Sequence, residues 1–260
     1  KILMANGTYS DLILRVQALA GISDFTPTEL TFLTSLVNRR ANLAYEATDY
    51  WPRYLVAGEI RSLKTSTVNA GSFVVGTTYT ILTVGNTNFV SIGAASSTVG
   101  VVFVATGVGT GTGTATLNSN IVPFTQAGKD TIDTFLRIHK TYQPFYLYSA
   151  VELEYYVNAD GAHLVGDTAP STNTYVTYKM VWDGPYTNAS TNIPYEWLDY
   201  LAHSVYADYL RQDGQNEKAI AEENIAKGIL DDQLQKTDVS RATGMMAHRI
   251  STHNSRSFRR

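Results

Sequence analysis

The segment IPYEWLDYLAHSVYADYLRQDGQNEKAIAEENIAKGILDDQLQK (193–236) carries the clearest helical pattern in the chain. Pro194 is well suited to the start of a helix, and Asp213-Gly214 breaks the pattern after about five turns. Apolar residues recur at helical spacing on both sides of that break: Trp197, Leu198, Leu201, Val205, Tyr209 and Leu210 before it, and Ile220, Ile225, Ile229, Leu230 and Leu234 after it. Because the connection is short, the two helices are predicted to pack as an antiparallel hairpin.

Two further helices are predicted near the N-terminus. Leu12, Val16 and Leu19 share one face of a helix over 9–19. Thr26-Pro27-Thr28-Glu29 places proline at the first helical position and forms a capping box, so a second helix is predicted to begin there. Asp49-Tyr50-Trp51-Pro52 ends this helix, because a proline disfavours helical geometry in the residue before it.

An uncharged segment interrupts the middle of the chain. No Asp, Glu, Lys or Arg occurs between Lys64 and Lys129, and nine of the 19 glycines lie between 71 and 113. Mixed-charge sequence flanks the segment on both sides, which is typical of an insertion. Runs of β-branched and aromatic residues predict short strands at 73–75, 79–84 and 101–104. The Gly–Thr alternation over 107–114 is typical of either a flexible linker or a glycine-tolerant last strand.

Strands outside this insertion are predicted at 54–57, 132–138, 151–155 and 175–182. The expected fold class is therefore α+β: a four-helix bundle with a small antiparallel β-sheet, an inserted small β-module and an extended C-terminal tail. The expected domains are a body formed by 1–64 and 118–237, the β-module at 65–117 and the tail at 238–260. The tail lacks apolar periodicity and carries five arginines, so it is predicted to be disordered on its own.

The composition excludes several classes of function. Hydrophobic residues make up 44% of the 260 positions, so the chain can bury a sizeable core. The formal net charge of -3 argues against nucleic-acid binding through bulk positive charge. The absence of cysteine excludes disulfides, cysteine-ligated metals and a cysteine nucleophile. The most apolar run, 99–108, is shorter than a membrane span requires, and 1–5 is too short for a signal peptide.

No pattern predicts catalysis, a cofactor or a metal. His203 lies four residues after Asp199 and is interpreted as a helix-surface residue paired with it; the other histidines, His139, His163, His248 and His253, are scattered. Glu152 and Glu154 lie on the same side of a predicted strand, as paired glycosidase carboxylates do, but the exposed face of an ordinary strand carries such pairs too. Clustered tyrosines are interpreted as filling sheet faces and subunit contacts, with stacking on carbohydrate or bases as the alternative. These are Tyr142, Tyr146, Tyr148, Tyr155 and Tyr156.

Two stretches resemble bacteriophage virion proteins. The hairpin over 193–219, with its Pro-led helix, its Asp-Gly turn and the start Glu217-Lys218-Ala219, is similar to the head-to-tail adaptor (connector) proteins of tailed phages. The N-terminal helices, with Asn38-Arg39-Arg40 and Trp51-Pro52, fit the same family. GTTYTI (76–81), GNTNF (85–89) and VGVVFVATG (99–107) are similar to a small β-module that recurs in phage neck, tail and fibre proteins. The module implies a virion component without specifying which one.

The resemblance implies a structural protein of the virion neck, between portal and tail, with no enzymatic activity. Adaptors of this family form a ring, usually of twelve copies, beneath the portal protein, and the opposite face receives a tail-tube or nozzle component. Phage DNA passes through the lumen without sequence-specific binding, and neither a membrane nor a cofactor takes part. Two alternatives stay open: another neck or tail-completion protein, and a virion surface module that grips a glycan or a host surface.

The C-terminal segment of such adaptors docks against the portal, which makes 239–260 the predicted portal anchor. Isolated apolar residues stand among its arginines, a pattern that suits pockets and carboxylates on an acidic partner. The predicted portal-binding residues are Met245, Met246, Arg249, Ile250, Arg256, Phe258, Arg259 and Arg260. The alternative is a non-specific basic tail that brushes DNA or the portal surface.

Overall fold

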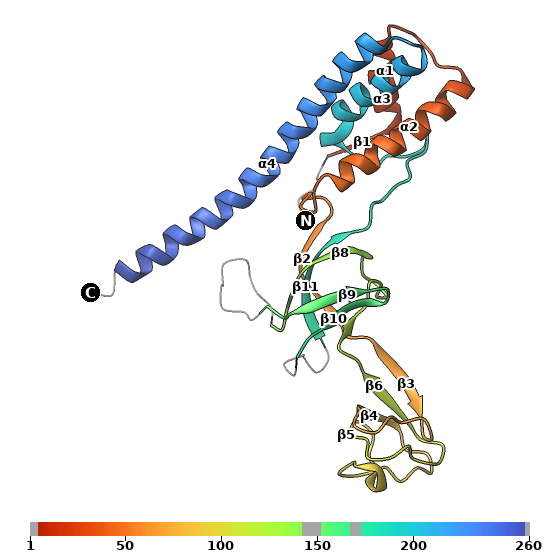
Figure 1. The fold of residues 1–260 in the computed structure, drawn as a ribbon, viewed down its shortest axis with the longest axis vertical. Coiled ribbons are helices and arrows are strands. Elements are labelled where there is room, and N and C mark those ends of the chain that lie inside the picture. The colour runs from red at the N-terminus through yellow and green to blue at the C-terminus, as the bar shows by residue number, and fades with distance from the viewer. Residues whose placement is uncertain (1–4, 142–151, 167–172, 258–260) are drawn as a thin grey trace. The chain divides into compact units, whose positions relative to one another are not determined.

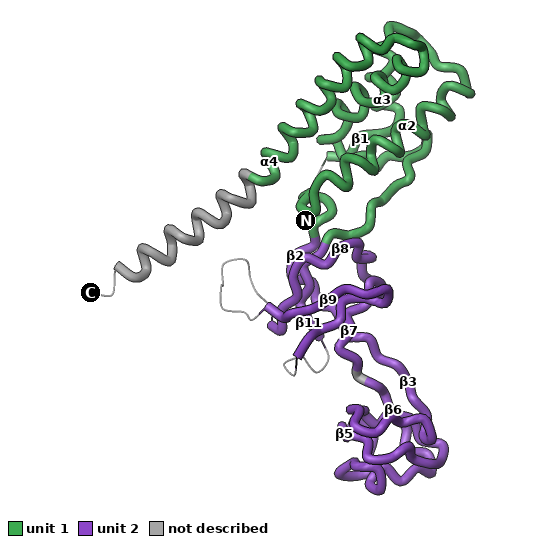
Figure 2. Tube along the Cα trace, viewed as in Figure 1, with its two compact units in different colours: residues 1–55, 179–260 green, residues 56–178 purple. Residues whose placement is uncertain are grey.

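The computed structural model describes residues 5–141, 152–166 and 173–257, with side chains as far as Asp238 apart from Asn118. The chain forms two compact units, which are described separately (Figure 2). Unit 1 combines 1–55 with 179–260, and unit 2 is 56–178. The four helices of the described residues belong to unit 1, whereas unit 2 is built from strands and one short 3-10 turn (Figure 1).

The elements of unit 1 follow one another in a simple order. They are β1 (Asn6–Gly7), α1 (Tyr9–Ala20), α2 (Pro27–Glu46), β12 (Ile193–Pro194), the 3-10 turn η2 (Tyr195–Trp197), α3 (Leu198–Gln212) and α4 (Asn216–Ser257). The predicted hairpin is confirmed, and Gly214, at φ 77°, makes the turn between α3 and α4. The first helix of the hairpin begins at Leu198, later than Pro194 indicates, because Ile193 and Pro194 pair with β1.

Capping boxes begin both N-terminal helices. Thr8 and Thr26 are the N-caps, and each hydroxyl accepts a hydrogen bond from the backbone N–H three residues further on. The carboxylates of Asp11 and Glu29 accept hydrogen bonds from the cap residues in return. These bonds satisfy donors that a helix start leaves unpaired, and they confirm the predicted beginning of α2.

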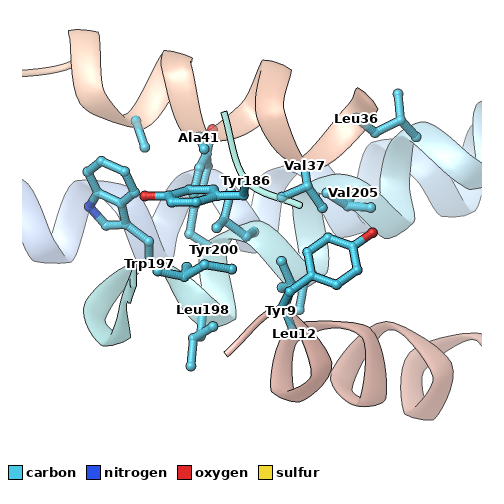
Figure 3. Close-up of a cluster of buried hydrophobic side chains, with 14 of the residues drawn as sticks. Tyr9, Leu12, Leu36, Val37, Ala41, Tyr186, Trp197, Leu198, Tyr200 and Val205 are labelled. Carbon is cyan, nitrogen blue, oxygen red and sulfur yellow. The ribbon is translucent and has the colours of Figure 1, made fainter. Parts of the chain in front are cut away.

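One hydrophobic core fills unit 1. Figure 3 shows Leu12 of α1, Val37 of α2 and Val205 of α3 within this cluster, and all three are completely buried. The first half of α4 contributes Ala226 and a row of partly buried residues: Ile229, Leu230 and Leu234. The apolar stripes that the sequence places on each helix therefore meet in one interior.

Unit 2 consists of short antiparallel strands. They are β2 (Leu55–Ser62), β3 (Thr65–Asn69), β4 (Thr78–Thr83), β5 (Val102–Val104), β6 (Thr114–Asn118), β7 (Ile121–Val122), β8 (Ile132–His139), β9 (Tyr155–Asn158), β10 (Gly161–Leu164) and β11 (Asn173–Met180). The strand orders are β2-β11-β8, β7-β10-β9 and β3-β6-β4-β5. A turn at 158–161 joins β9 to β10.

The segment predicted to be an inserted module has a core of its own. Four aromatic residues pack inside it: Phe73, Tyr79, Phe89 and Phe103. In the sheet β3-β6-β4-β5, Thr65 at the start of β3 lies opposite Asn118 at the end of β6, so the chain enters and leaves through neighbouring strands. The strand predicted at 73–75 is wrong, because Phe73 turns inward from a loop to fill the core.

The expected fold class is wrong. Within 5–141, 152–166 and 173–257 the fold is mixed α+β, with four helices and four separate sheets of two, three, three and four strands, and not a four-helix bundle with one small sheet. The sheets join strands from distant parts of the chain, such as β1 with β12 and β2 with β11, and pairing of this kind leaves no local signal in the sequence. The predicted strand at 151–155 is reduced to an isolated bridge between Glu152 and His139, with β9 beginning at Tyr155.

The expected extended tail is also corrected. Helix α4 was predicted to end near Lys236, but it continues to Ser257. No proline interrupts 238–257, and the alanine, methionine and arginine residues in this stretch have high helix propensity. The loss of apolar periodicity therefore does not mark the end of the helix.

Candidate interaction site

Asp208, in the middle of α3, accepts hydrogen bonds from three arginines. Nε and Nη2 of Arg40 donate to its two carboxylate oxygens over 2.7 and 2.6 Å. Arg39 donates over 2.7 Å and Arg211 over 3.2 Å. Arg40 and Asp208 are both buried, and a buried bidentate pair of this kind holds two elements in one orientation. The pair therefore fixes α2 against α3.

Glu223 brings α4 into the same network. Its carboxylate lies 3.4 Å from Nη1 and Nη2 of Arg40 and also pairs with Arg211. Burial raises the pKa of Asp208, but the hydrogen bond and charge of Arg40 outweigh burial and hold that pKa below its ordinary value. Arginine side chains occupy both carboxylates of the network. Asp208 thereby connects α3 to α2, and Glu223 connects α4 to the same arginines.

A second, partly buried network surrounds Asp183. Its carboxylate accepts hydrogen bonds from the hydroxyl of Tyr54 over 2.7 Å and from Nδ2 of Asn192 over 3.0 Å, and it pairs with Arg53 at 3.1 Å. Burial raises the pKa of the Tyr54 hydroxyl, and it raises the pKa of Tyr186 to about 12. This network ties the segment before β12 to the turn between α2 and β2.

An open depression lies beside α4 in unit 1. It has a volume of about 470 Å³, and its lining includes the apolar residues Trp51, Pro52 and Ile229. Charged and polar side chains of η2, α3 and α4 also line it: Glu196, Asp199, Gln233 and Lys236.

The predicted portal-binding residues lie further along α4. Five of them, Met245, Met246, Arg249, Ile250 and Arg256, fall on the helical backbone, but their side chains are outside the described residues. Phe258, Arg259 and Arg260 lie outside the described residues altogether. Their assignment to portal binding stays a prediction.

The histidines do not form a metal site in the part of the chain that is described. His203 pairs with Glu222 of α4, with Nδ1 and Oε2 2.6 Å apart, and not with Asp199 as the spacing predicts. Asp199 pairs instead with Arg15 of α1. The side chains of His248 and His253 are outside the described set, and in that set three metal-ligating groups do not come together. His203 thus contributes to the contact between α3 and α4.

The other candidates for chemistry are dispersed. Glu152 and Glu154 are both exposed, on a stretch that is not a regular strand. The hydroxyl of Tyr155 donates to the carbonyl of Phe135, and Tyr156 stacks on His163 with ring centroids 4.9 Å apart. Of the clustered tyrosines, Tyr142, Tyr146 and Tyr148 lie outside the described residues.

The glycine-rich stretch is a packed loop that precedes β6. Asn86 Oδ1 accepts a hydrogen bond from the backbone N–H of Thr112 over 2.7 Å, and Thr87 Oγ1 accepts one from that of Gly113 over 2.8 Å. A Cβ atom at Gly113 would lie 2.5 Å from the carbonyl oxygen of Val84, so glycine is required for this close approach. Both sequence alternatives, a flexible linker and a last strand, are therefore wrong, because β6 begins only at Thr114.

Sequence reasoning missed the network around Asp208. Asn38-Arg39-Arg40 entered only through the family resemblance, and no partner was assigned to it. A signal was present, because Asp208 interrupts the apolar face of a helix and a charge in that position needs a counter-charge. The sequence does not show which helix supplies the arginines.

Comparisons with known proteins do not assign the chain to a class. No family model matches it, and no curated protein is detectably similar to it. In the described part of the chain, no helix combines the length and the apolar character that crossing a membrane requires.

Proposed function

We propose that this chain is a structural protein of a tailed-phage virion, a head-to-tail adaptor in the neck that joins the capsid portal to the tail. One observation carries the proposal: α4 has 42 residues and its hairpin partner α3 has only 15. At about 1.5 Å per residue, α4 is roughly 40 Å longer than the helix it packs against. A helix that continues so far past its hairpin is suited to docking on another protein.

The charges on this continuation indicate the kind of partner. After Asp238 the chain has five arginines and no acidic residue, although the whole chain carries a net charge of -3. The end of α4 is therefore expected to bind an acidic protein surface. The resemblance to adaptor proteins indicates that this partner is the portal. The predicted portal-binding residues are the methionines, arginines, Ile250 and Phe258 named above.

The internal pairing of unit 1 supports a structural role. Its buried carboxylate Asp208 is held by arginines, and Asp183 is held by a tyrosine, an arginine and an amide. Groups arranged in this way stabilise a fixed shape, which a ring subunit needs. In the proposed assembly, copies form a ring, usually twelve, the opposite face contacts a tail-tube or nozzle component, and DNA passes through the lumen.

The test separates the adaptor from its alternatives. Purified full-length chain is sedimented with portal rings, with tail-tube protein, and alone, and is also applied to a glycan array. The proposal predicts co-sedimentation with portal rings and no glycan signal. Binding to tail-tube protein alone would instead indicate a tail-completion protein, and a saturable glycan signal without portal binding would indicate a surface module.

A further inference from the structure

The start of the described chain lies in the open depression beside α4. Ala5, the first described residue, is part of its lining, together with Tyr195 and Glu196 of η2. The backbone N–H of Tyr195 donates to the carbonyl of Ala5 over 3.3 Å, and in the adjoining pairing of β1 with β12 Asn6 lies opposite Pro194. The residues that precede Ala5 therefore start from a point that hydrogen bonds hold within the lining.

The segment that precedes Ala5 is apolar. It reads Lys1-Ile2-Leu3-Met4 and lies outside the described residues. Removal of three such apolar side chains from water is favourable, and the gain grows with the apolar area that is buried. The depression offers apolar side chains from two parts of unit 1, Trp51 and Pro52 after α2 and Ile229 of α4. Its volume of about 470 Å³ lies in the range of pockets that enclose small ligands.

We infer that residues 1–4 of the same chain occupy this depression. The attachment at Ala5 selects the occupant, because a segment tethered beside a site is present there at an effective concentration on the order of millimolar. A separate molecule must first lose its freedom of movement to bind at the same place. The charges are also compatible: the carboxylate of Glu196 has no partner among the described residues, and Lys1 is the charged residue of the segment.

Occupation of the depression adds contacts to α4 near the end of its packed part. Ile229, Gln233 and Thr237 of α4 line the depression, and the arginine-rich stretch 239–260 begins two residues after Thr237. The N-terminal segment thereby supports α4 just before its continuation. The inference concerns a contact within one chain and is tested without portal, so its outcome is independent of the proposed function.

Disulfide formation tests the contact in the full-length chain. The chain has no cysteine, so the double variant L3C/Q233C carries two thiols, one in the segment and one in the lining. The matched control L3C/Q235C moves the second thiol to an exposed glutamine of α4 that is not part of the lining. Two residues along a helix lie on opposite sides of it, and a disulfide requires close Cα atoms, so L3C/Q233C should oxidise within one chain about tenfold faster than the control. Equal rates, or disulfides between two chains on a denaturing gel, would overturn the inference.

Thiol protection provides a second measurement that needs no cross-link. In the single variant Q233C, the segment is expected to shield the thiol from a maleimide reagent. Adding I2S/L3S/M4S to Q233C should raise the alkylation rate by about tenfold, because serine removes the apolar area that holds the segment in place. Q235C should react at the same rate with and without these substitutions. An unchanged rate in Q233C, or a similar rise in Q235C, would refute the contact.

Discussion

The indole rings of Trp51 and Trp197 meet edge to face in the core of unit 1, with centroids 5.6 Å apart, but their N–H groups differ. Nε1 of Trp51 donates to the carbonyl of Ala44 over 2.8 Å. Nε1 of Trp197 is buried and has no hydrogen-bond partner among the described residues. Two indoles in one cluster therefore contribute to stability in different ways.

This difference predicts an order of stability for tryptophan variants. Trp197→Ala should lower the free energy of unfolding by about 3–5 kcal/mol, because the ring is fully buried. Trp51→Phe should lower the free energy of unfolding by about 1 kcal/mol more than Trp197→Phe does, because only Trp51→Phe removes a hydrogen bond. Chemical denaturation of the four proteins measures the order. If Trp197→Ala melts like the unmodified chain but loses partner binding, Trp197 belongs to an interface.

Removal of the Asp208 carboxylate should strongly destabilise unit 1. Asp208→Asn removes the negative charge that Arg39, Arg40 and Arg211 share, and breaking a buried ion pair costs about 3–5 kcal/mol. Glu223→Gln is the matched control, since Glu223 is more exposed and lies further from Arg40; it should cost less than about 1 kcal/mol. Similar losses in the two variants would show that Asp208 is not the centre of the network.

The ion pair between Arg40 and Asp208 also predicts that the free energy of unfolding depends on pH. The pKa of Asp208 is lowered in the folded protein, so its contribution is complete above its unfolded value of about 4 and is lost as the pH falls through the folded value. The difference in unfolding free energy between the unmodified chain and Asp208→Asn should therefore shrink below about pH 4. Urea titrations at several pH values measure this difference, and a constant difference down to pH 2 would contradict the assignment.

Excision of the module should leave unit 1 folded. Thr65 and Asn118 are paired neighbours, so a short Gly-Ser loop can replace 65–117 without stretching the chain. All three tryptophans, Trp51, Trp182 and Trp197, belong to unit 1, which makes tryptophan fluorescence a specific probe of that unit. The shortened chain should keep the fluorescence melting transition of the full chain. Loss of that transition would show that the module is part of the structural body.

Two glycines of the module should respond differently to alanine. A Cβ atom at Gly113 would lie 2.5 Å from the carbonyl oxygen of Val84, whereas at Gly107 the nearest atom is 3.5 Å away. Gly113→Ala should therefore speed hydrogen exchange across 65–117, and Gly107→Ala should not. In both variants the tryptophan fluorescence of unit 1 should be unchanged. Equal exchange in the two variants would mean that the loop is not tightly packed.

The sequence predicts local structure well where one residue type determines the geometry. The capping box at Thr26 and the turn at Gly214 follow from hydrogen bonding and backbone freedom that are local to a few residues. The separation into four sheets was missed, because pairing between strands far apart in the chain leaves no local signal. The partner of Asp208 was missed for the same reason: Arg40 is 168 residues away.

The extent of α4 shows a second limit of prediction from pattern. Apolar periodicity reports only the part of a helix that packs on its own core, and among the side chains described in α4, which reach Asp238, the last such residue is Leu234. The helical backbone continues to Ser257. Such a stretch is visible in composition only as the absence of proline and as helix-favouring residues.

The function of the α4 continuation depends on the order of its residues. If it anchors the chain to the portal, deletion after Thr237 should abolish portal binding, and Ile250→Ala and Phe258→Ala should each weaken it. A scrambled 239–260 segment with the same charge should also fail to bind, since anchoring requires apolar residues at fixed positions. A non-specific basic tail would tolerate the scramble and release the portal at high salt. Unchanged binding after deletion would place the attachment site elsewhere on unit 1.

Electron microscopy of portal rings mixed with an excess of the full-length chain shows whether this chain is a head-to-tail adaptor. If it is, averaged images should contain a second ring, coaxial with the portal and absent from portal alone, at one end of the portal. The same images recorded with the chain truncated after Thr237 should lack that ring. Portal images that are unchanged by the full-length chain would contradict the assignment of this protein as a head-to-tail adaptor.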